Sequence, residues 1–281
     1  MLILKKIEDL ENHLKKLREK GGKVGFIPTM GALHAGHISL LVNSQKQCKI
    51  NVVSIFVNPT QFNDKSDFDK YPVTLNKDIE LLNDGGCDVL FLPAVKEMYP
   101  SGFVNKGKLD FGFLAKTLEG EHRPSHFDGM AQIVEKLLRI VKPDKLFMGQ
   151  KDYQQQLIVG QLIKKMRFKT TLVTCPTLRE KSGLAMSSRN VRLDAPSLKL
   201  ALEISKTLKG VKAAIHHPKS NIEQVQQWGA KRLSGFKGIE LEYFEIRSAN
   251  TLMPAKSKRE KLVALVAVKI GGVRLIDNMV L

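Results

Sequence analysis

Residues 23–41 read KVGFIPTMGALHAGHISLL, and this stretch decides how the chain is expected to fold. Val24 to Ile27 is a short apolar run of strand-forming residues, which Pro28 is expected to end, and an apolar helical pattern begins at Ile38. A strand, a tight turn and a helix in this order favour anion binding, because the first amides of a helix lack intrahelical partners and lie at the positive end of its dipole. The stretch therefore predicts a phosphate-binding turn.

His34 and His37 lie three residues apart where that helix starts, so both imidazoles face the same way and offer two further donors. Gly36 between them lets a ligand approach the backbone closely. Two histidines at this spacing can also simply cap a helix or ligate zinc. A zinc site is less favoured, because no acidic residue lies between them and no third ligand follows closely. The strand-to-helix junction therefore favours a nucleotide site without a metal held by the protein.

Composition and charge narrow the class of protein. The 281 residues include 43% hydrophobic ones, enough for one large core or two smaller ones, and the formal net charge is +17. The basic residues are spread along the chain without an aromatic stacking motif, so nucleotide and carboxylate substrates explain the charge about as well as nucleic acid does. No apolar run approaches membrane-spanning length and the start does not resemble a signal peptide, so we expect a cytoplasmic protein with no membrane partner. The three widely spaced cysteines predict neither a disulfide framework nor a zinc ribbon.

Apolar runs alternate with helical patterns as far as Pro176, which we take as the boundary between two domains. Before Pro176 we expect helices at 3–20, 75–82 and 130–141 and strands at 24–27, 51–57, 87–92, 145–148 and 170–175. The long segment 99–126 has weak periodicity and is expected to be a functional loop. After Pro176, an α+β domain is expected from helices at 197–216 and 222–233 and strands at 239–246 and 262–270.

Polar clusters follow several of these strands, at the edge where open α/β sheets bind ligands. Asn58 and Gln61 follow the second strand, and Gly149 to Asp152 follow the strand at 145–148. Each cluster could consist of ordinary turn residues, but the second repeats the placement of the histidine turn. Beyond Pro176, Ser187 and Ser188 stand next to an arginine, a combination of donors that suits phosphate oxygens.

HAGH at 34–37 resembles the HIGH motif of class I nucleotidyl-transferring enzymes, and MSSRN at 186–190 resembles their KMSKS loop; both motifs contact ATP there. Together with PTMGALHAGH, FVNPTQF, FMGQKDYQQ, REKSGLAMSSRN and RLIDN, they resemble the pantothenate synthetase family, the pantoate–β-alanine ligases, from about residue 20 onward. The resemblance implies an α/β fold, with a Rossmann-like parallel-sheet domain at 1–176 that binds ATP and pantoate. It also implies a smaller C-terminal α+β lid domain at 177–281 and a homodimer.

In this family the carboxylate of (R)-pantoate attacks the α-phosphate of ATP to give pantoyl adenylate and pyrophosphate, and the amine of β-alanine then displaces AMP. Neither step needs a serine or cysteine nucleophile, so the work falls to preorganised donors. ATP is a substrate and is expected to bring Mg²⁺, held mainly by phosphate oxygens and water. The resemblance makes His34, His37 and Lys151 catalytic, with His37 as proton donor and Lys151 neutralising phosphate charge.

The resemblance also assigns binding residues. Gln61 and Gln155 match the glutamines that bind pantoate, Gln61 also lies near β-alanine, and Arg123 is a further contact. The residues expected to bind ATP are Met30, Gly31, Ala32, Leu33, His34, Ala35, Gly36, His37, Gly149, Gln150, Lys151, Asp152, Leu178, Met186, Ser187, Ser188 and Arg189.

Departures from the family pattern and rival identities define what must be tested. Asn63 to Lys65 stand where the family often has Gly-Pro-Asn, and Val73 where it often has Arg, which bears on the nearby loop and dimer contacts. One rival is another HIGH-type nucleotidyltransferase, such as a cytidylyltransferase or a tRNA-charging enzyme. Little chain remains after Pro176 for an anticodon-binding domain, and Gln61 and Gln155 suit a small polar acid. The other rival, a non-enzymatic nucleic-acid-binding protein, rests on charge alone.

Overall fold

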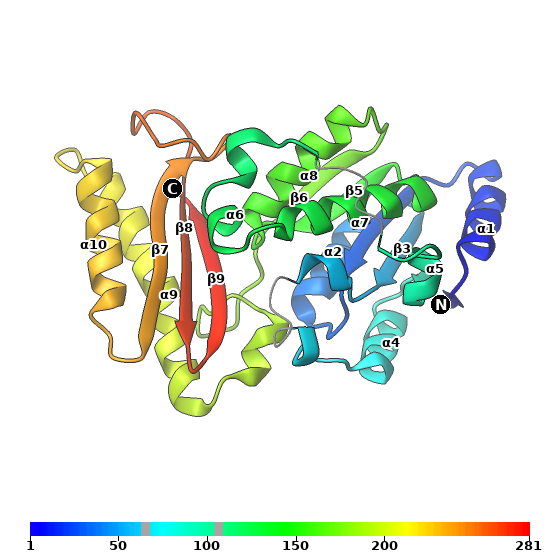
Figure 1. Ribbon diagram of the computed structural model, residues 1–281, viewed down its shortest axis with the longest axis horizontal. Helices are drawn as coiled ribbons and strands as arrows, with labels where there is room; N and C mark the ends of the chain where they lie inside the picture. The colour runs from blue at the N-terminus through cyan, green and yellow to red at the C-terminus, as the bar shows by residue number, and fades with distance from the viewer. Residues whose placement is uncertain (63–67, 104–108) are drawn as a thin grey trace.

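The computed structural model describes residues 1–62, 68–103 and 109–281, so the unusual residues 63–65 lie outside the described part of the chain. A parallel sheet of six strands, in the order β1-β4-β3-β2-β5-β6, forms its larger half (Figure 1). The strands are β1 (Leu2–Leu4), β2 (Val24–Thr29), β3 (Ile50–Ile55), β4 (Val89–Phe91), β5 (Lys145–Gly149) and β6 (Thr171–Cys175). The expected α/β fold is confirmed.

Helices cover both faces of this sheet. Helices α1 (Ile7–Glu19), α7 (His126–Val141) and α8 (Tyr153–Lys165) share one core with it, and α2 (Ala35–Gln45) and α4 (Leu75–Asp84) share the other. The connections contain the short elements η1 (Pro59–Gln61), α5 (Val95–Met98), η2 (Gly112–Ala115) and α6 (Glu119–His122). Within the described residues, every helix is too short or too polar to cross a membrane.

The strands read as continuous apolar runs because both faces are buried. Along β2, Phe26 faces the core under α1, α7 and α8, whereas Ile27 faces the core under α2 and α4. Leu146 and Phe147 divide in the same way on β5. All four side chains are at most 1% exposed, so the sheet centre is rigid and can hold the loops at its edge in place.

A second, antiparallel sheet follows in the chain, in the order β7 (Ile239–Ser248), β8 (Leu262–Ile270), β9 (Val273–Val280). Helices α9 (Ala195–Ile215) and α10 (Ile222–Ser234) pack on one face, and η3 (Ser188–Arg192) precedes them (Figure 1). Val263 and Leu265 on the other face join the core of α7 and α8. The expected smaller α+β part is thus present, while the domain boundary at Pro176 stays a prediction.

Pro28 does not end its strand but separates two neighbouring strands. The pairing of β2 with β3 continues to Thr29, whereas its pairing with β5 stops at Phe26. Val24 points its carbonyl toward the β5 side, where it accepts from the Asp144 amide, so alternation turns Pro28 to the same side. Because proline has no amide hydrogen, the ladder toward β5 cannot continue there, and the sheet opens.

Several expected boundaries were wrong for reasons of tertiary context. Residues 2–4 form β1, parallel to β4, instead of starting the first helix, because pairing at a sheet edge outweighs a helical pattern. Helix α2, by contrast, starts at Ala35 with His34 as its cap, so both histidines lie at its start as expected, although the apolar pattern begins only at Ile38. The loop at 99–126 contains η2 and α6, and the chain after Gly272 forms β9, which the sequence had not indicated.

Gly129 on α7 and Gly160 on α8 offer a matched test of packing. A Cβ at Gly129 would overlap the carbonyl oxygen of Thr60 in η1, whereas a Cβ at Gly160 would lie 3.6 Å from Leu172 Cδ2, an ordinary contact. We expect Gly129→Ala to lower the free energy of unfolding by about 1–3 kcal/mol. Gly160→Ala should raise it by up to about 1 kcal/mol through helix propensity. Urea unfolding of both variants measures this, and equal effects would contradict the close packing of α7 on η1.

Candidate active site

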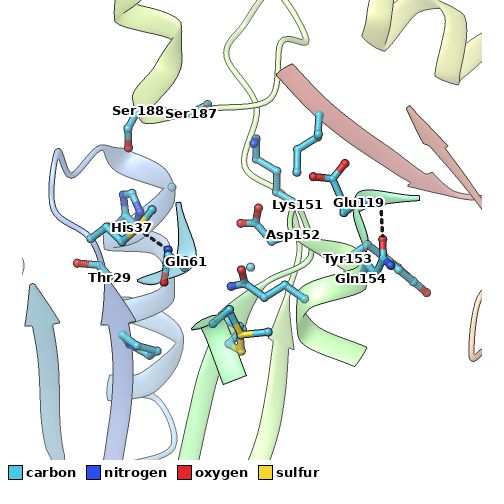
Figure 2. Close-up of a pocket in the computed structure, with 18 of the residues that line it drawn as sticks. Thr29, His37, Gln61, Glu119, Lys151, Asp152, Tyr153, Gln154, Ser187 and Ser188 are labelled. Atoms are coloured by element: carbon cyan, nitrogen blue, oxygen red, sulfur yellow. Dashed lines mark hydrogen bonds between the residues drawn. The ribbon is translucent and has the colours of Figure 1, made fainter. Parts of the chain in front are cut away.

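A cavity opens where β2 and β5 diverge, beyond the carboxyl ends of the strands. At this point of the strand order the connections leave in opposite directions, and open α/β sheets bind ligands there. Figure 2 shows His37 and Gln61 on one side of the cavity and Lys151 and Asp152 on the other, with Ser187 and Ser188 above. The first loop after β2 therefore faces the first loop after β5.

Most of the predicted site residues line this cavity. They are Met30, His34, Gly36, His37, Gln61, Gly149, Lys151, Asp152, Gln155, Leu178, Met186, Ser187, Ser188 and Arg189. Five others lie outside the lining: residues 31–33 are buried, Ala35 is exposed on α2, and Gln150 is half-buried. The side chains of these five do not reach the cavity, so they shape the turns that carry their neighbours.

His34 and His37 hold each other at the start of α2. The Nδ1 of His34 accepts from the Gly36 amide at 3.1 Å, and the Nδ1 of His37 accepts from the His34 amide at 3.3 Å. The two rings lie 4.1 Å apart, centroid to centroid. Because a neutral imidazole that accepts at Nδ1 carries its proton at Nε2, both rings keep an Nε2–H donor for a ligand in the cavity.

Both histidines are neutral at physiological pH. Burial lowers the pKa of His37 to about 3, and the positive charges that His34 and Lys151 can carry act in the same direction. Burial, and then Lys151, lower the pKa of His34 to about 4, against a smaller opposing effect of Asp152. The turn therefore offers hydrogen-bond donors without charge, while Lys151 supplies the positive charge across the cavity.

Asp78 on α4 fixes the backbone between β2 and α2. Its side chain is 1% exposed, and its two carboxylate oxygens accept from the amides of Ala32 and Leu33 at 2.9 and 2.8 Å. The Thr74 hydroxyl donates to the same carboxylate at 2.9 Å. Gly31 and Ala32 both have positive φ, at 82° and 49°, a conformation that an alanine adopts only under constraint. Asp78 supplies that constraint.

The serine loop lies directly against this turn. The Ser188 hydroxyl donates to the Ala32 carbonyl at 3.0 Å, and the Ser187 hydroxyl accepts from the Arg189 amide at 3.3 Å. Asn190 closes the loop by donating to the Ala185 carbonyl at 3.0 Å. Two segments 156 residues apart in the chain are thus joined at one edge of the cavity.

Gln61 is held by a histidine that the sequence did not single out. His126 lies at the start of α7, and its Nδ1 is 2.8 Å from the Gln61 carbonyl, while its Nε2 is 3.2 Å from Arg123 Nη1. Arg123 can only donate, so the Nε2 accepts and the Nδ1 carries the proton. Burial, followed by the charge of Arg123, lowers the pKa of His126 to about 4. The ring is therefore neutral and fixed in one tautomer.

A buried acid ties α6 to the second sheet. Glu119, 6% exposed, accepts two hydrogen bonds of 2.7 Å from Arg274 on β9 and one of 2.7 Å from the Tyr243 hydroxyl on β7. Burial alone would raise the pKa of Glu119, but the hydrogen bonds and charge of Arg274 lower it to about 2. The acid is thus a structural anion that completes the cavity wall and also lies 3.7 Å from Arg123.

Other lining residues escaped sequence reasoning. Tyr243, Asp277 and Asn278 reach the cavity from the second sheet, and His126 lines it from the start of α7. Asp78 acts from behind the lining. RLIDN was a signal for two of them, but nothing local distinguishes the others from ordinary core or helix residues. Among the described residues, no group of three or more His, Cys, Asp or Glu side chains could hold a metal.

This geometry is typical of a class: parallel α/β enzymes that bind nucleotides at the switch point of the sheet, where this chain has neutral donors, a lysine and a serine loop around one cavity. The sequence model of the pantoate-beta-alanine ligase family matches residues 2–280, and the chain belongs to this family. The family resemblance seen in the sequence motifs is confirmed. Membership over the whole length does not favour the rival identities.

Relatives and solved structures agree with this assignment. Pantothenate synthetase of Cytophaga hutchinsonii is 44% identical over 283 residues, which cover 100% of this chain and 99% of that protein. The crystal structure of pantothenate synthetase from Thermus thermophilus matches with a TM-score of 0.93 at 34% identity, covering 99% of both chains. Pantoate-beta-alanine ligase from Francisella tularensis, complexed with beta-gamma ATP and beta-alanine, matches with a TM-score of 0.82 at 38% identity, covering 100% of this chain and 97% of that one.

Acidification from pH 6.5 to 4.5 should destabilise the protein. Unfolded histidines take up protons in this range, whereas the pKa values of His37 and His126 in the folded protein are about 3 and about 4. The unfolded state then binds more protons than the folded state. The free energy of unfolding therefore decreases as the pH is lowered, by up to about 1.4 kcal/mol per pH unit for each of these two histidines. Urea unfolding at several pH values measures the slope. His126→Asn should make it shallower by about one proton, and an unchanged slope would refute the buried neutral state of His126.

Asp78→Asn should loosen the turn that precedes α2. The amide group can accept from only one of the two backbone amides and turns a donor toward the other, which leaves a buried donor unsatisfied. We expect a loss of about 1–3 kcal/mol in the free energy of unfolding. Asp194→Asn is the matched control, because Asp194 accepts from a backbone amide at the exposed start of α9. If the free energy of unfolding decreases equally little in both variants, Asp78 does not constrain the turn.

Proposed function

We propose that the chain condenses (R)-pantoate with β-alanine to form pantothenate, using ATP and releasing AMP and pyrophosphate. One observation carries this proposal: the neutral donors of His34 and His37 face Lys151 across a cavity that also contains Gln61 and Gln155. Hydrogen-bond donors that suit phosphate and amide groups that suit a small polar acid thus line the same cavity. The names of the relatives support the same reaction.

In the first step, a carboxylate oxygen of pantoate forms a bond to the α-phosphorus of ATP, and the bond to the leaving pyrophosphate breaks. Negative charge accumulates on the phosphate oxygens, and the Nε2–H groups of His34 and His37 and the ammonium of Lys151 are placed to stabilise it. The proton-donor role that the resemblance gives His37 is proposed as a hydrogen bond from its Nε2–H, because a neutral imidazole keeps that proton. Ser187, Ser188 and Arg189 are proposed to close over the triphosphate.

In the second step, the amine of β-alanine attacks the acyl carbon of the adenylate, an amide bond forms and AMP leaves. Gln61 and Gln155 are proposed to hold the pantoyl hydroxyls and carbonyl, with Gln61 fixed from behind by His126. Once the acyl group is activated, the reaction needs orientation more than further acid or base catalysis. Neutral amide groups that orient the substrate therefore suit this end of the cavity.

Mg²⁺ is proposed to enter with ATP. Two carboxylates of the lining, Glu119 and Asp277, are already held by Arg274 and Arg179, and Asp152 is exposed at the rim. Phosphate oxygens and water would therefore be the main ligands, which suits the octahedral preference of Mg²⁺. We further propose that the enzyme works in the cytoplasm as a homodimer, as the family resemblance implies.

Pyrophosphate release from Mg·ATP tests the proposed reaction. Release should require D-pantoate, and AMP and pantothenate should accumulate only when β-alanine is added. A folded protein that binds ATP but does not respond to pantoate would overturn the substrate assignment and leave the nucleotide site standing.

His37→Ala and Lys151→Ala should each reduce pantoate-dependent exchange of pyrophosphate into ATP by about 10² or more, the scale of losing one preorganised donor. Thermal unfolding should stay close to that of the unmodified protein. His216→Ala and Lys199→Ala, on exposed positions of α9 and its cap, are matched controls and should exchange normally. Near-normal exchange by a folded His37 or Lys151 variant would exclude the role assigned to that residue.

A further inference from the structure

The motif RLIDN, residues 274–278, belongs to β9 and has no part in the reaction as described so far. β9 is the edge strand of the second sheet that faces the larger sheet (Figure 1). It pairs with β8, where Asn278 lies opposite Leu265, and the Asn278 backbone amide donates to Asp277 Oδ1 at 2.7 Å. Asp277 and Asn278 are buried, at 4% and 2% exposed, and both side chains also make hydrogen bonds outside their own sheet.

Asn278 reaches across to the loop after β5. Its Nδ2 donates to the carbonyls of Gln150 and Lys151 at 3.0 and 2.8 Å, and its Oδ1 accepts from Gln150 Nε2 at 3.3 Å. Both amide hydrogens are thereby used, one on each carbonyl. The backbone amide of Gln150 in turn donates to the Cys175 carbonyl at 2.8 Å. The backbone that carries Lys151 is thus fixed by a side chain of the other sheet.

Asp277 anchors the serine loop at the same place. Its two carboxylate oxygens accept from Arg179 at 2.7 and 2.9 Å, and Arg179 also donates to the carbonyls of Gly183 and Asn278, both at 3.1 Å. Arg179 pairs with Ala185 in a β-bridge at the base of the segment that leads to Ser187. Bidentate pairing fixes the orientation of the guanidinium, and with it the base of this loop.

We propose that Asn278 is a positioning residue that aims Lys151 at the phosphates, and that the neighbouring Asp277 sets the serine loop against the same point. This inference rests on the proposed function, because it assigns a task within the adenylation step. A lysine ammonium sits on a long flexible stem, so its reach is defined only if the backbone below it is fixed. A displacement of about 1 Å at a reacting group can cost about 10²-fold in rate.

Asn278→Ala is the direct test. It removes two donors from the carbonyls under Lys151, and we expect the rate of pantoate-dependent pyrophosphate exchange at saturating substrates to fall about 10- to 100-fold. The KM values for pantoate and β-alanine should change less than this rate, because Gln61 on η1 and Gln155 on α8 lie outside the two residues whose carbonyls Asn278 binds. Asn278→Asp should behave similarly, since a carboxylate would face two carbonyl oxygens.

Asn51→Ala is the matched control. Asn51 is 4% exposed in β3 and likewise uses its side chain for buried hydrogen bonds, with Ser44 and Asp88, away from the cavity. It should lower thermal stability as much as Asn278→Ala does while leaving exchange near normal. If Asn51→Ala reduces the exchange rate equally, the effect of Asn278 is general destabilisation and the inference fails.

Two further measurements separate positioning from other roles. In the Lys151→Ala background, Asn278→Ala should cost nothing more, because it acts through a side chain already removed. Hydrogen–deuterium exchange of the backbone amides at 149–153 should accelerate in Asn278→Ala and stay unchanged in Asn51→Ala. Additive losses in the double variant, or unchanged amide exchange, would overturn the inference.

These outcomes also distinguish this inference from the proposed function. A parent protein without pantoate-dependent exchange would refute the reaction, and the amide exchange at 149–153 would then still decide whether Asn278 holds the turn. An active parent whose Asn278→Ala variant exchanges pyrophosphate normally would refute the positioning role alone.

Discussion

The site depends on one buried carboxylate, that of Asp78, which accepts hydrogen bonds from the backbone amides of Ala32 and Leu33. Because these amides point back into the protein, the chain must turn through two residues of positive φ before it enters α2. That turn brings His34 to the cap position, where its ring and that of His37 bind the backbone of the helix start. The tautomers of the two rings, and hence the N–H groups that they turn toward the cavity, thus depend on the contact of Asp78 with the other side of the turn.

The cavity separates charge from hydrogen bonding. Three histidines around it, His34, His37 and His126, have lowered pKa values and stay neutral, so each serves as a fixed donor rather than a switch. Positive charge comes from Lys151 on the opposite wall. The buried anion Glu119 is balanced by Arg274 and does not compete with a nucleotide for that charge. Donors preorganised in this way need no rearrangement when charge develops during the reaction.

Sequence reasoning located the cavity residues whose position depends on the local backbone and missed those whose position depends on distant partners. A strand, a turn and a helix predict an anion site at His34 from neighbours alone, and the same reasoning located Lys151. Asp78 lies 45 residues from Leu33, and no local pattern marks it. RLIDN drew attention to Asn278, but its contact with Lys151, 127 residues away, cannot be seen in a local pattern. β1 was mistaken for helix because its pairing with β4 is invisible in a short window.

The link from Asn278 to Lys151 has a consequence for biosynthesis of the protein. A ribosome makes β5 and α8 well before β9, so the nascent chain can form most of the parallel sheet while the turn at 149–152 still lacks its partner. Contacts so distant along the chain form late and slow the final folding steps. The backbone hydrogen bond that Asn278 makes to Lys151 therefore forms only after residue 278 has been translated and the second sheet has packed against the first.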